Sequence, residues 1–513
     1  MIHVVPRPTS LHELNAEPFV LDESTTISSD PELSDAAVLL GEMIRPATRL
    51  PLHSSRRGRI RFALDEQLDA EAYEIIADAA GVEVRASGRL GALHAVQTIR
   101  QLLPTEVYAP EPQLDVVWAV PAVRIFDRPV LAWRGAHLDT GRHFMPVAFV
   151  HRFIDLIALH KFNRLHLHLT EDQGWRIEIP AYPRLTEVGA WRIGTAVGRH
   201  IPPWSDDPVH DGIPHGGFYT REDLTGFVEH AARLGIDVLP EIEMPGHAQA
   251  AIAAYPWLGN GVEAEVARGW GVSPHVFSVS DRTLQFCKEV LEVVFDVFPF
   301  EFVHLGADEC PKEEWRTSTE AQERMRAEGL ADVDELQSWF LSQITAFVHE
   351  HGRRVIGWDE ILEGGLPPAA AVMSWRGEGG GLAAAAMGHD VVMAPQERTY
   401  FDFYQGSEAS EPLAHGPLLA LEAVRAYDPF PADLPEDQRS RVLGSQFQLW
   451  SEYLTDPQQV EYMAFPRACA FADVLWGTPD DGTFLTDALP VHLRRLDQLA
   501  VNFRRPRTGA SAP

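Results

Sequence analysis

The chain has 513 residues, of which 45% are hydrophobic and 23% are charged, as expected for a soluble globular protein with a full core. Asp and Glu number 74 against 43 Lys and Arg, and the resulting net charge of −31 argues against nucleic acid or an anionic membrane as a partner. The length suits two domains if one is a barrel of about 250 residues or more, since a large barrel counts as a single domain.

The three cysteines, Cys287, Cys310 and Cys469, have no paired spacing, so neither a disulfide framework nor a zinc site is predicted. The N-terminus lacks a basic segment followed by an apolar one, and no apolar run approaches the roughly 18 residues that span a bilayer. We therefore expect a cytoplasmic protein, with export left open because a chain that had lost a leader would look the same. Whether it is a monomer or a homodimer is also left open.

Residues 1–127 are predicted to form a small α+β domain. Tyr73–Ala77 and Gly81–Ala86 alternate apolar and polar residues, which is typical of strands in a sheet with one covered face. Gly88–Leu103 carries apolar residues at helical spacing. The segment Pro121–Pro129 has two prolines and no periodicity, so it is the predicted linker.

From Leu131 onward, short apolar strands alternate with helical stretches, which predicts an α/β fold with a (β/α)8 barrel over residues 128–504. The eight predicted strands are Leu131–Asp139, Arg164–Thr170, Asp237–Glu243, Phe302–Gly306, Arg354–Asp359, Ala371–Trp375, Asp390–Ala394 and Val442–Leu449. Helices are predicted at Val147–His160, Arg221–Leu234, Asp281–Phe298, Val333–His351, Gly380–Met387 and Asp487–Phe503. Residues 505–513 are predicted to be a disordered tail.

Barrel enzymes carry their active sites at the C-terminal ends of the strands, and polar or aromatic residues stand at every predicted strand end. The fourth strand is followed by Asp308 and Glu309, which are costly to bury without a function. Alone, this pair could equally begin a helix, whose dipole favours acids in the first turn. The convergence of carboxylates and tryptophans on one mouth of the barrel favours an active site.

Tryptophans at several strand ends would form an aromatic box, in which rings stack on the C–H face of a sugar and polar side chains bind its hydroxyls. Carboxylates in such a box indicate glycoside hydrolysis, in which an acid protonates the leaving oxygen. Two carboxyl groups normally straddle the scissile bond, and the adjacent Asp308 and Glu309 are badly placed to do so. Either the second group stands on another strand, or the substrate supplies its own nucleophile, as in substrate-assisted families.

A metal-dependent hydrolase is an alternative, because His166 and His168 form an HxH pair on one face of a strand. Such a site needs further ligands, and neither His nor Lys stands at the ends of the fifth and sixth strands. We therefore favour histidines packed in the barrel interior and hydrogen-bonded near the site, and we predict no metal.

Eight motifs stand on the predicted strands in turn. They are Trp133–Gly135 with Asp139 and Arg142, His168–Arg176, Pro240–His247, His304–Glu309, Gly357–Glu360, Ser374–Gly377, Tyr400–Asp402 and Leu449–Glu452. In content and order they closely resemble those of glycoside hydrolase family 20, the β-N-acetylhexosaminidases. Residues 1–127 resemble the non-catalytic α/β domain of the family, so the resemblance covers nearly the whole chain.

The resemblance implies that Glu309 is the general acid/base and that Asp308 orients the 2-acetamido group of the substrate. The acetamido carbonyl then attacks the anomeric carbon and forms an oxazolinium ion. The implied partners are Tyr400, which donates a hydrogen bond to the acetamido oxygen, and Asp172 and His247, which form a relay behind Glu309. The implied sugar-binding residues are Trp358, Trp375 and Trp450 around the N-acetyl group, and Arg134, Asp402 and Glu452 at the ring hydroxyls.

Other polar residues at the strand ends are expected to support the site. Glu171, for instance, is expected to be a supporting residue or part of a loop salt bridge. Asp139, Arg142 and His166 are expected to serve packing or loop anchoring.

The sequence therefore predicts an exo-acting, retaining β-N-acetylhexosaminidase that removes terminal GlcNAc or GalNAc from a small carbohydrate. No cofactor is implied, because the amide of the substrate is the nucleophile. Two alternatives remain, a catalytically silent protein that binds N-acetyl sugars on the same barrel and the metal-dependent hydrolase that would use His166 and His168. The intact set of Asp308, Glu309 and Tyr400 argues against the silent protein.

Overall fold

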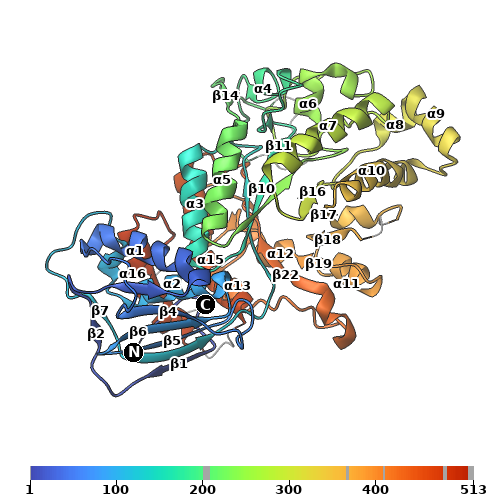
Figure 1. Cartoon of the computed structure of the whole chain (residues 1–513). Coiled ribbons are helices and arrows are strands. Elements are labelled where there is room, and N and C mark those ends of the chain that lie inside the picture. Colours follow the sequence, from blue (N-terminus) through green and yellow to red (C-terminus); the bar gives the residue numbers. More distant parts are fainter. Residues whose placement is uncertain are drawn as a thin grey trace.

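The computed structural model describes residues 2–199, 208–365, 369–407, 409, 411–477 and 482–505. An N-terminal domain of sheet and helices precedes a closed eight-stranded barrel (Figure 1), which confirms the predicted fold class. Among the described residues, no helix combines the length and the apolar character needed to cross a membrane.

The N-terminal domain is built on a six-stranded sheet with the order β1-β8-β5-β6-β4-β3. Buried and half-buried residues alternate along the central strands β5 and β6, as the alternation in the sequence predicted. Helix α2 (Arg89–Leu102) packs on this sheet beside α1 (Ser34–Thr48), and it confirms the predicted helix. The strands are β1 (Ser10–Glu13), β3 (Ile27–Ser29), β4 (Ile60–Leu64), β5 (Tyr73–Asp78), β6 (Gly81–Ala86) and β8 (Val123–Asp127).

Eight parallel strands close the barrel in the order β10-β15-β16-β17-β18-β19-β22-β9. Closure is made where Gly444 on β22 pairs with Trp133 on β9. All residues of β9 are buried, because side chains fill the barrel inside and helices cover it outside. The strands, each one or two residues shorter than predicted, are β9 (Trp133–Asp139), β10 (Arg164–His168), β15 (Asp237–Glu241), β16 (Phe302–His304), β17 (Arg354–Trp358), β18 (Ala371–Ser374), β19 (Val391–Met393) and β22 (Val442–Phe447).

Helices surround the barrel, and polar caps fix where several of them begin. Ser280 accepts a hydrogen bond from the Thr283 amide at the start of α7, and Asp332 does the same for two amides at the start of α10. The covering helices include α3 (Val147–Leu159), α5 (Arg221–Arg233), α7 (Asp281–Val297), α10 (Val333–Glu350), α11 (Gly379–Ala386), α14 (Pro457–Ala464), α15 (Arg467–Trp476) and α16 (Leu489–Gln498).

The last helix differs from its prediction, Asp487–Phe503, at both ends. A π-helical turn over Phe484–Ala488 precedes α16, so Asp487 lies inside this turn and does not cap the helix. The helix stops at Gln498, shortly before Ala500 adopts a left-handed backbone conformation. Residues 506–513 of the predicted tail lie outside the described residues, and Arg505 forms an ion pair with Asp497.

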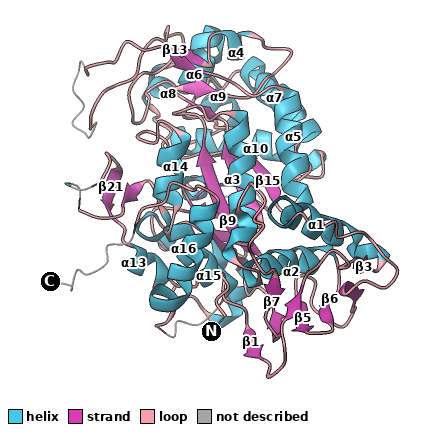
Figure 2. Cartoon of the chain, turned by 90° about the vertical axis from the view of Figure 1, so that its left-hand side faces the viewer, coloured by secondary structure: helices cyan, strands magenta, loops and turns pink. Residues whose placement is uncertain are grey.

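The N-terminal domain packs against one end of the barrel, and the loops that carry β13 (Trp191–Arg192) and α4 (Arg184–Glu187) lie at the other end (Figure 2). A fully buried ion pair joins the two domains, since Lys161 Nζ lies 2.9 Å from Asp127 Oδ2 and 2.8 Å from the Tyr73 hydroxyl. The indole of Trp476 donates to the other oxygen of Asp127.

Arg134 belongs to this domain interface. Its side chain is 1% exposed and donates to Glu71 of the N-terminal domain at 2.5 Å and to the carbonyls of Leu131 and Lys161. Arg134 stands near the start of β9, whereas the barrel mouth lies past the end of this strand. The expectation that Arg134 binds sugar hydroxyls is therefore wrong, because its position in the strand places it at the opposite end of the barrel.

Arg134→Ala is expected to destabilise the protein by about 3 kcal/mol, because removing one partner of a buried ion pair leaves the other charge uncompensated. Urea unfolding followed by tryptophan fluorescence measures this change. The matched control is Arg124→Ala, which removes an exposed arginine that pairs with Glu74 and should cost at most about 1 kcal/mol. Equal losses in the two variants would contradict the interface role of Arg134.

Candidate active site

The loop after β16 turns sharply at the barrel mouth. Gly306, Ala307 and Glu309 all have positive φ angles, of 66°, 74° and 45°. A Cβ on Gly306 would lie 1.7 Å from Glu243 Oε2, so only glycine fits there. Left-handed backbone costs about 1–3 kcal/mol at a residue with a side chain, and such strain is often found at functional sites. This turn brings Asp308 and Glu309 into one pocket.

His247 contacts both carboxylates of this pair. Its Nε2 lies 3.6 Å from Asp308 Oδ2 and 3.5 Å from Glu309 Oε2. On the other side of the ring, Nδ1 lies 2.8 Å from Glu171 Oε1 and 3.3 Å from Asp172 Oδ2. The structure therefore brings together the predicted relay of Asp172, His247 and Glu309, and it adds Glu171, which makes the shorter contact with His247.

The charges around His247 determine how these groups ionise. Burial opposes a charged imidazole, but contacts with Glu171, Asp172 and Asp308 outweigh it and hold the pKa of His247 well above its usual value. Burial also acts to raise the pKa of Glu309, but the close, charged ring of His247, together with Arg142, holds that pKa below its usual value. The pKa of Asp172 is raised by burial and by the charge of Glu171.

Aromatic rings wall the pocket that Asp308 and Glu309 enter. The ring centroids of Trp358 and Trp450 are 5.7 Å apart. Trp375 stacks on Tyr400, with a centroid distance of 6.2 Å and an interplanar angle of 17°. The indole N–H groups of Trp358 and Trp375 donate to Glu241 and Glu360, which fixes the orientation of both rings. The side chains that line this pocket are those of Arg142, Asp308, Glu309, Trp358, Trp375, Tyr400, His415, Trp450 and Glu452.

Arg142 lines the pocket, although the sequence analysis assigned it to packing or loop anchoring. It forms ion pairs with Asp139 at 3.4 Å and Glu171 at 3.0 Å, and its guanidinium lies 4.8 Å from the Trp450 ring centre. It therefore anchors the loop and also faces the pocket. Its place three residues past the end of β9 is the signal in the sequence that could have favoured Arg142 over Arg134.

His415 is a pocket residue that the sequence analysis missed, because it lies in the long segment after β19. Its Nδ1 lies 3.6 Å from Asp402 Oδ2, and neither oxygen of Asp402 accepts a hydrogen bond from the described residues. The nearby carboxylate of Asp402 raises the pKa of His415 to about 9. Both carboxylate oxygens of Asp402, beside the pocket, can therefore still accept hydrogen bonds.

The HxH pair lies in the barrel interior below the pocket. Glu241 is the centre of this region, with His166 Nε2 at 3.1 Å, His168 Nδ1 at 2.5 Å and His304 Nδ1 at 2.9 Å from its oxygens. His168 also contacts Glu171, which links this network to His247. The hydrogen bonds of His168 with Glu241 and Glu171, and that of His166 with Gln446, confirm the prediction of hydrogen-bonded interior histidines. They satisfy His168 on both ring nitrogens without an ion.

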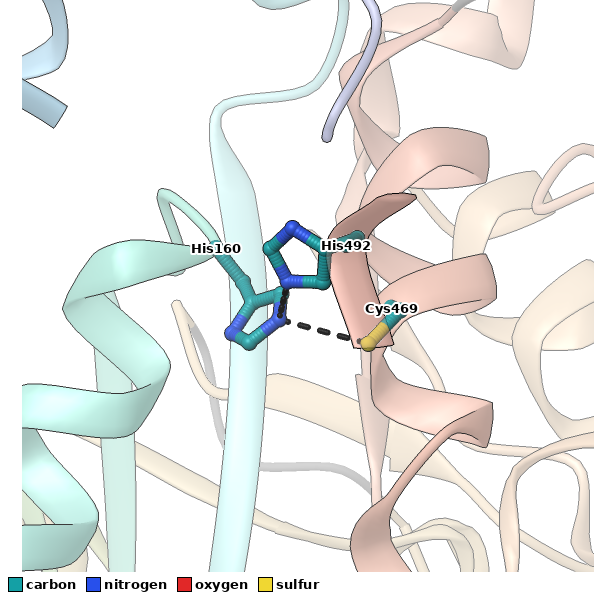
Figure 3. A group of neighbouring side chains, drawn as sticks. All are labelled: His160, Cys469 and His492. Carbon is teal, nitrogen blue, oxygen red and sulfur yellow. Dashed lines mark hydrogen bonds between the residues drawn. The ribbon is translucent and has the colours of Figure 1, made fainter. Parts of the chain in front are cut away.

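A second group of metal-binding residue types, His160, Cys469 and His492, lies where the end of α3 meets α15 and α16 (Figure 3). His160 Nε2 lies 2.9 Å from His492 Nε2 and 3.3 Å from Cys469 Sγ. Burial lowers the pKa of His160 to about 4, so a neutral ring can hydrogen-bond to its neighbour. The Arg495 guanidinium lies 3.4 Å from His492 Nδ1, and this cation beside a single thiol disfavours a metal ion.

A barrel whose mouth holds a carboxylate pair inside a tryptophan-lined pocket is the arrangement of a glycoside hydrolase. The comparison with known families agrees with the geometry. The catalytic-domain model of glycosyl hydrolase family 20 matches residues 131–479, and the model of domain 2 of that family matches residues 1–128. The chain therefore belongs to glycosyl hydrolase family 20, as the motifs predicted.

Several known proteins match this chain over most of its length. A beta-hexosaminidase of Porphyromonas gingivalis is 42% identical over 98% of the chain, which spans 64% of the length of that protein. A beta-N-acetylhexosaminidase of Cellulomonas fimi is 32% identical over 94% of this chain and 91% of its own. The solved GH20 beta-N-acetylhexosaminidase of Streptomyces coelicolor A3(2) has 30% identity and a TM-score of 0.84, and the match covers 98% of this chain and 97% of that one.

Proposed function

We propose that the protein is an exo-acting, retaining β-N-acetylhexosaminidase that removes terminal GlcNAc or GalNAc by substrate-assisted catalysis. The observation that carries this proposal is the adjacent pair Asp308 and Glu309, which share His247 at the wall of a tryptophan-lined pocket. Neighbours in sequence cannot straddle a glycosidic bond. The third carboxylate that lines the pocket, Glu452, follows the strand diametrically opposite β16, where it would meet the far end of the sugar ring. The substrate-assisted mechanism that the family resemblance implies takes its nucleophile from the substrate, and it fits this adjacent pair.

In the first step, Glu309 gives its proton to the leaving oxygen while the acetamido oxygen attacks C1. The bond from C1 to the leaving oxygen breaks, and an oxazolinium ion forms on the opposite face of the ring. In the second step, water attacks C1 and Glu309 takes a proton from the water. The bond between C1 and the acetamido oxygen breaks, so the oxazolinium ring opens, and the configuration at C1 is retained overall. Glu309 fits this task because its side chain is 38% exposed, at the opening through which the leaving group departs.

Asp308 is placed to act on the acetamido group. Its side chain is only 13% exposed and lies deeper than that of Glu309. A carboxylate there can accept the acetamido N–H, which orients the carbonyl towards C1 and stabilises the positive charge of the oxazolinium ion. The Tyr400 hydroxyl can donate to the acetamido oxygen, since burial raises the pKa of Tyr400 and keeps its proton in place.

Different groups of the pocket would meet the two ends of the sugar ring. In the proposed binding mode Glu309 stands at the C1 end of the sugar, and the N-acetyl group lies among the rings of Trp358, Trp375 and Trp450, which line the pocket. Arg142, Glu452 and Asp402 come from strands on the other side of the barrel, so they can hold the hydroxyls at the far end of the ring. A sugar that fills the pocket also removes water from Glu309, which favours the protonated form that the first step needs.

Replacing Glu309 by Gln should lower kcat on chitobiose about 10²–10⁴-fold, because the leaving amino sugar loses its proton donor. The loss should be much smaller on a 2,4-dinitrophenyl glycoside, whose leaving group needs no proton. Initial rates on both substrates separate an acid role from a structural one. Equal losses on the two would contradict the assignment.

Asp308→Asn should weaken the binding of a thiazoline analogue of the oxazolinium intermediate, because the neutral amide cannot stabilise the positive ring. A loss of roughly tenfold or more in affinity is expected for one charge-assisted hydrogen bond. Competitive inhibition of the residual activity gives the affinity. Unchanged binding of the thiazoline would rule out the orienting role.

His247→Asn removes the cation that holds the pKa of Glu309 low, so that pKa should rise. Activity requires protonated Glu309 in the first step and falls as pH passes its pKa, so the basic limb of kcat/KM should move to higher pH. The pH profile of kcat/KM on the 4-methylumbelliferyl glycoside of GlcNAc measures this shift. The control is His275→Asn, which removes a histidine that hydrogen-bonds to Glu314 outside the pocket and should leave the basic limb unchanged. An unmoved limb in His247→Asn would refute the coupling.

A further inference from the structure

A group of arginines without acidic partners lies at one edge of the N-terminal sheet. Residues 56–61 contain four arginines, although Asp and Glu outnumber Lys and Arg by 74 to 43 in the whole chain. The side chains of Arg56, Arg57 and Arg61 make neither an ion pair nor a hydrogen bond with any residue that the structure describes. The catalytic steps above use none of the three.

These three arginines line one hollow, which has a volume of about 330 Å³. We call it the arginine hollow. Asp30 also lines it, and Asp30 Oδ2 already accepts the backbone N–H of Leu64 at 2.8 Å. The walls among the described residues therefore carry three positive charges against one negative charge. The charged and hydroxyl side chains of these walls are those of Ser28, Ser29, Asp30, Arg56, Arg57 and Arg61.

The backbone brings two segments of the chain together at the arginine hollow. Arg61 lies on β4 and pairs in register with Ser28 on the edge strand β3. The segment before β4 runs along the other side of β3, where the Ser55 amide donates to the Ile27 carbonyl at 2.8 Å. Gly58 permits this close approach, since a Cβ there would lie 2.5 Å from the backbone nitrogen of Ser28. All three arginines are therefore held at one site by main-chain contacts.

The arginine hollow has the chemistry of a site for phosphate or sulfate. The cross-strand neighbour of Arg61 is Glu83, and this carboxylate already pairs with Arg85 at 3.2 Å. Guanidinium groups that gather around one hollow repel one another, and an anion with more than one charge would offset this repulsion. Arginine suits phosphate and sulfate, because two of its N–H groups can pair with two oxygens of the anion. The Ser28 and Ser29 hydroxyls make no hydrogen bond with the described residues, so they can also donate.

We propose that the arginine hollow binds a phosphate or sulfate group that is carried on a sugar. Its volume lies within the range of about 300–1,000 Å³ that is usual for small-molecule sites, whereas a free phosphate ion would leave most of the hollow to water. The Asp30 carboxylate can accept a hydroxyl of the sugar. The net charge of −31 disfavours a long polyanion such as nucleic acid. Because the N-terminal domain packs at the end of the barrel opposite the mouth, this inference does not depend on the proposed function.

The test measures the melting temperature of the full chain in glucose 6-phosphate, glucose 6-sulfate, glucose and sodium phosphate at one ionic strength. Glucose lacks an acetamido group, which disfavours binding of these probes in the catalytic pocket. Either ester, well above its Kd, should give a saturable rise of roughly 2 °C, because it binds the folded state, and glucose should give none. No saturable rise with either ester overturns the inference. Free phosphate that binds as tightly as glucose 6-phosphate overturns the sugar-borne occupant.

Substitutions test the position of the site. Arg56→Gln combined with Arg61→Gln removes two charges at exposed positions, so the fold should persist, and the affinity for glucose 6-phosphate should fall at least about tenfold. The matched control is Arg59→Gln, which removes an arginine of the same segment that pairs with Asp22 at 3.9 Å and does not line the hollow. Its affinity should stay within about twofold of the wild type.

Both variant proteins should hydrolyse the 4-methylumbelliferyl glycoside of GlcNAc at the wild-type rate, because the substituted residues lie outside the catalytic pocket. This rate shows that the barrel has folded in each variant. Equal losses of glucose 6-phosphate affinity in the double variant and in Arg59→Gln overturn the inference, since they would mean that diffuse positive charge, and not the arginine hollow, attracts the ester.

Discussion

The imidazolium of His247 lies between two pairs of carboxylates, and the charge balance of the active site depends on this one ring. Glu171 and Asp172 contact one nitrogen, and Asp308 and Glu309 contact the other. Four buried or half-buried carboxylates within reach of each other would repel strongly, and a single cation cannot neutralise them all. The pKa of Asp172 is raised by burial and by the charge of Glu171, and Glu171 is balanced by Arg142 as well as by His247. The two carboxylates that would meet the substrate thus remain free to do different tasks.

The same balance extends from the pocket into the barrel core. Glu171 contacts His168, which contacts Glu241, and Glu241 in turn accepts the indole N–H of Trp358. The proton-carrying side of the pocket and one of its aromatic walls are therefore held by one continuous hydrogen-bonded network. Buried polar networks of this kind are stable only when each member has its partners, so the network restricts how the pocket can relax.

The fold could be predicted because each barrel strand is a short apolar run between loops. The place of Glu309 at the barrel mouth could be predicted because two carboxylates follow one such run. Arg134 and Arg142 show where such prediction ends. Arg134 lies at the start of the first barrel strand and Arg142 follows its end, and because a strand rises about 3.3 Å per residue, the two lie at opposite ends of the barrel. The motif alone did not tell which end the side chain of Arg134 faces. His415 could not be predicted, because it reaches the pocket from an irregular segment whose path depends on tertiary packing.

The interface between the first domain and the barrel, at the end opposite the mouth, limits whether the two domains can be produced separately. Lys161 and Arg134 belong to the barrel, but their carboxylate partners Asp127 and Glu71 belong to the first domain. A barrel expressed alone would expose two cations and an indole that evolved to face protein, and its solubility would suffer. The first domain therefore forms part of the structural support of the barrel. If the barrel were transferred to another protein, the first domain would have to be transferred with it.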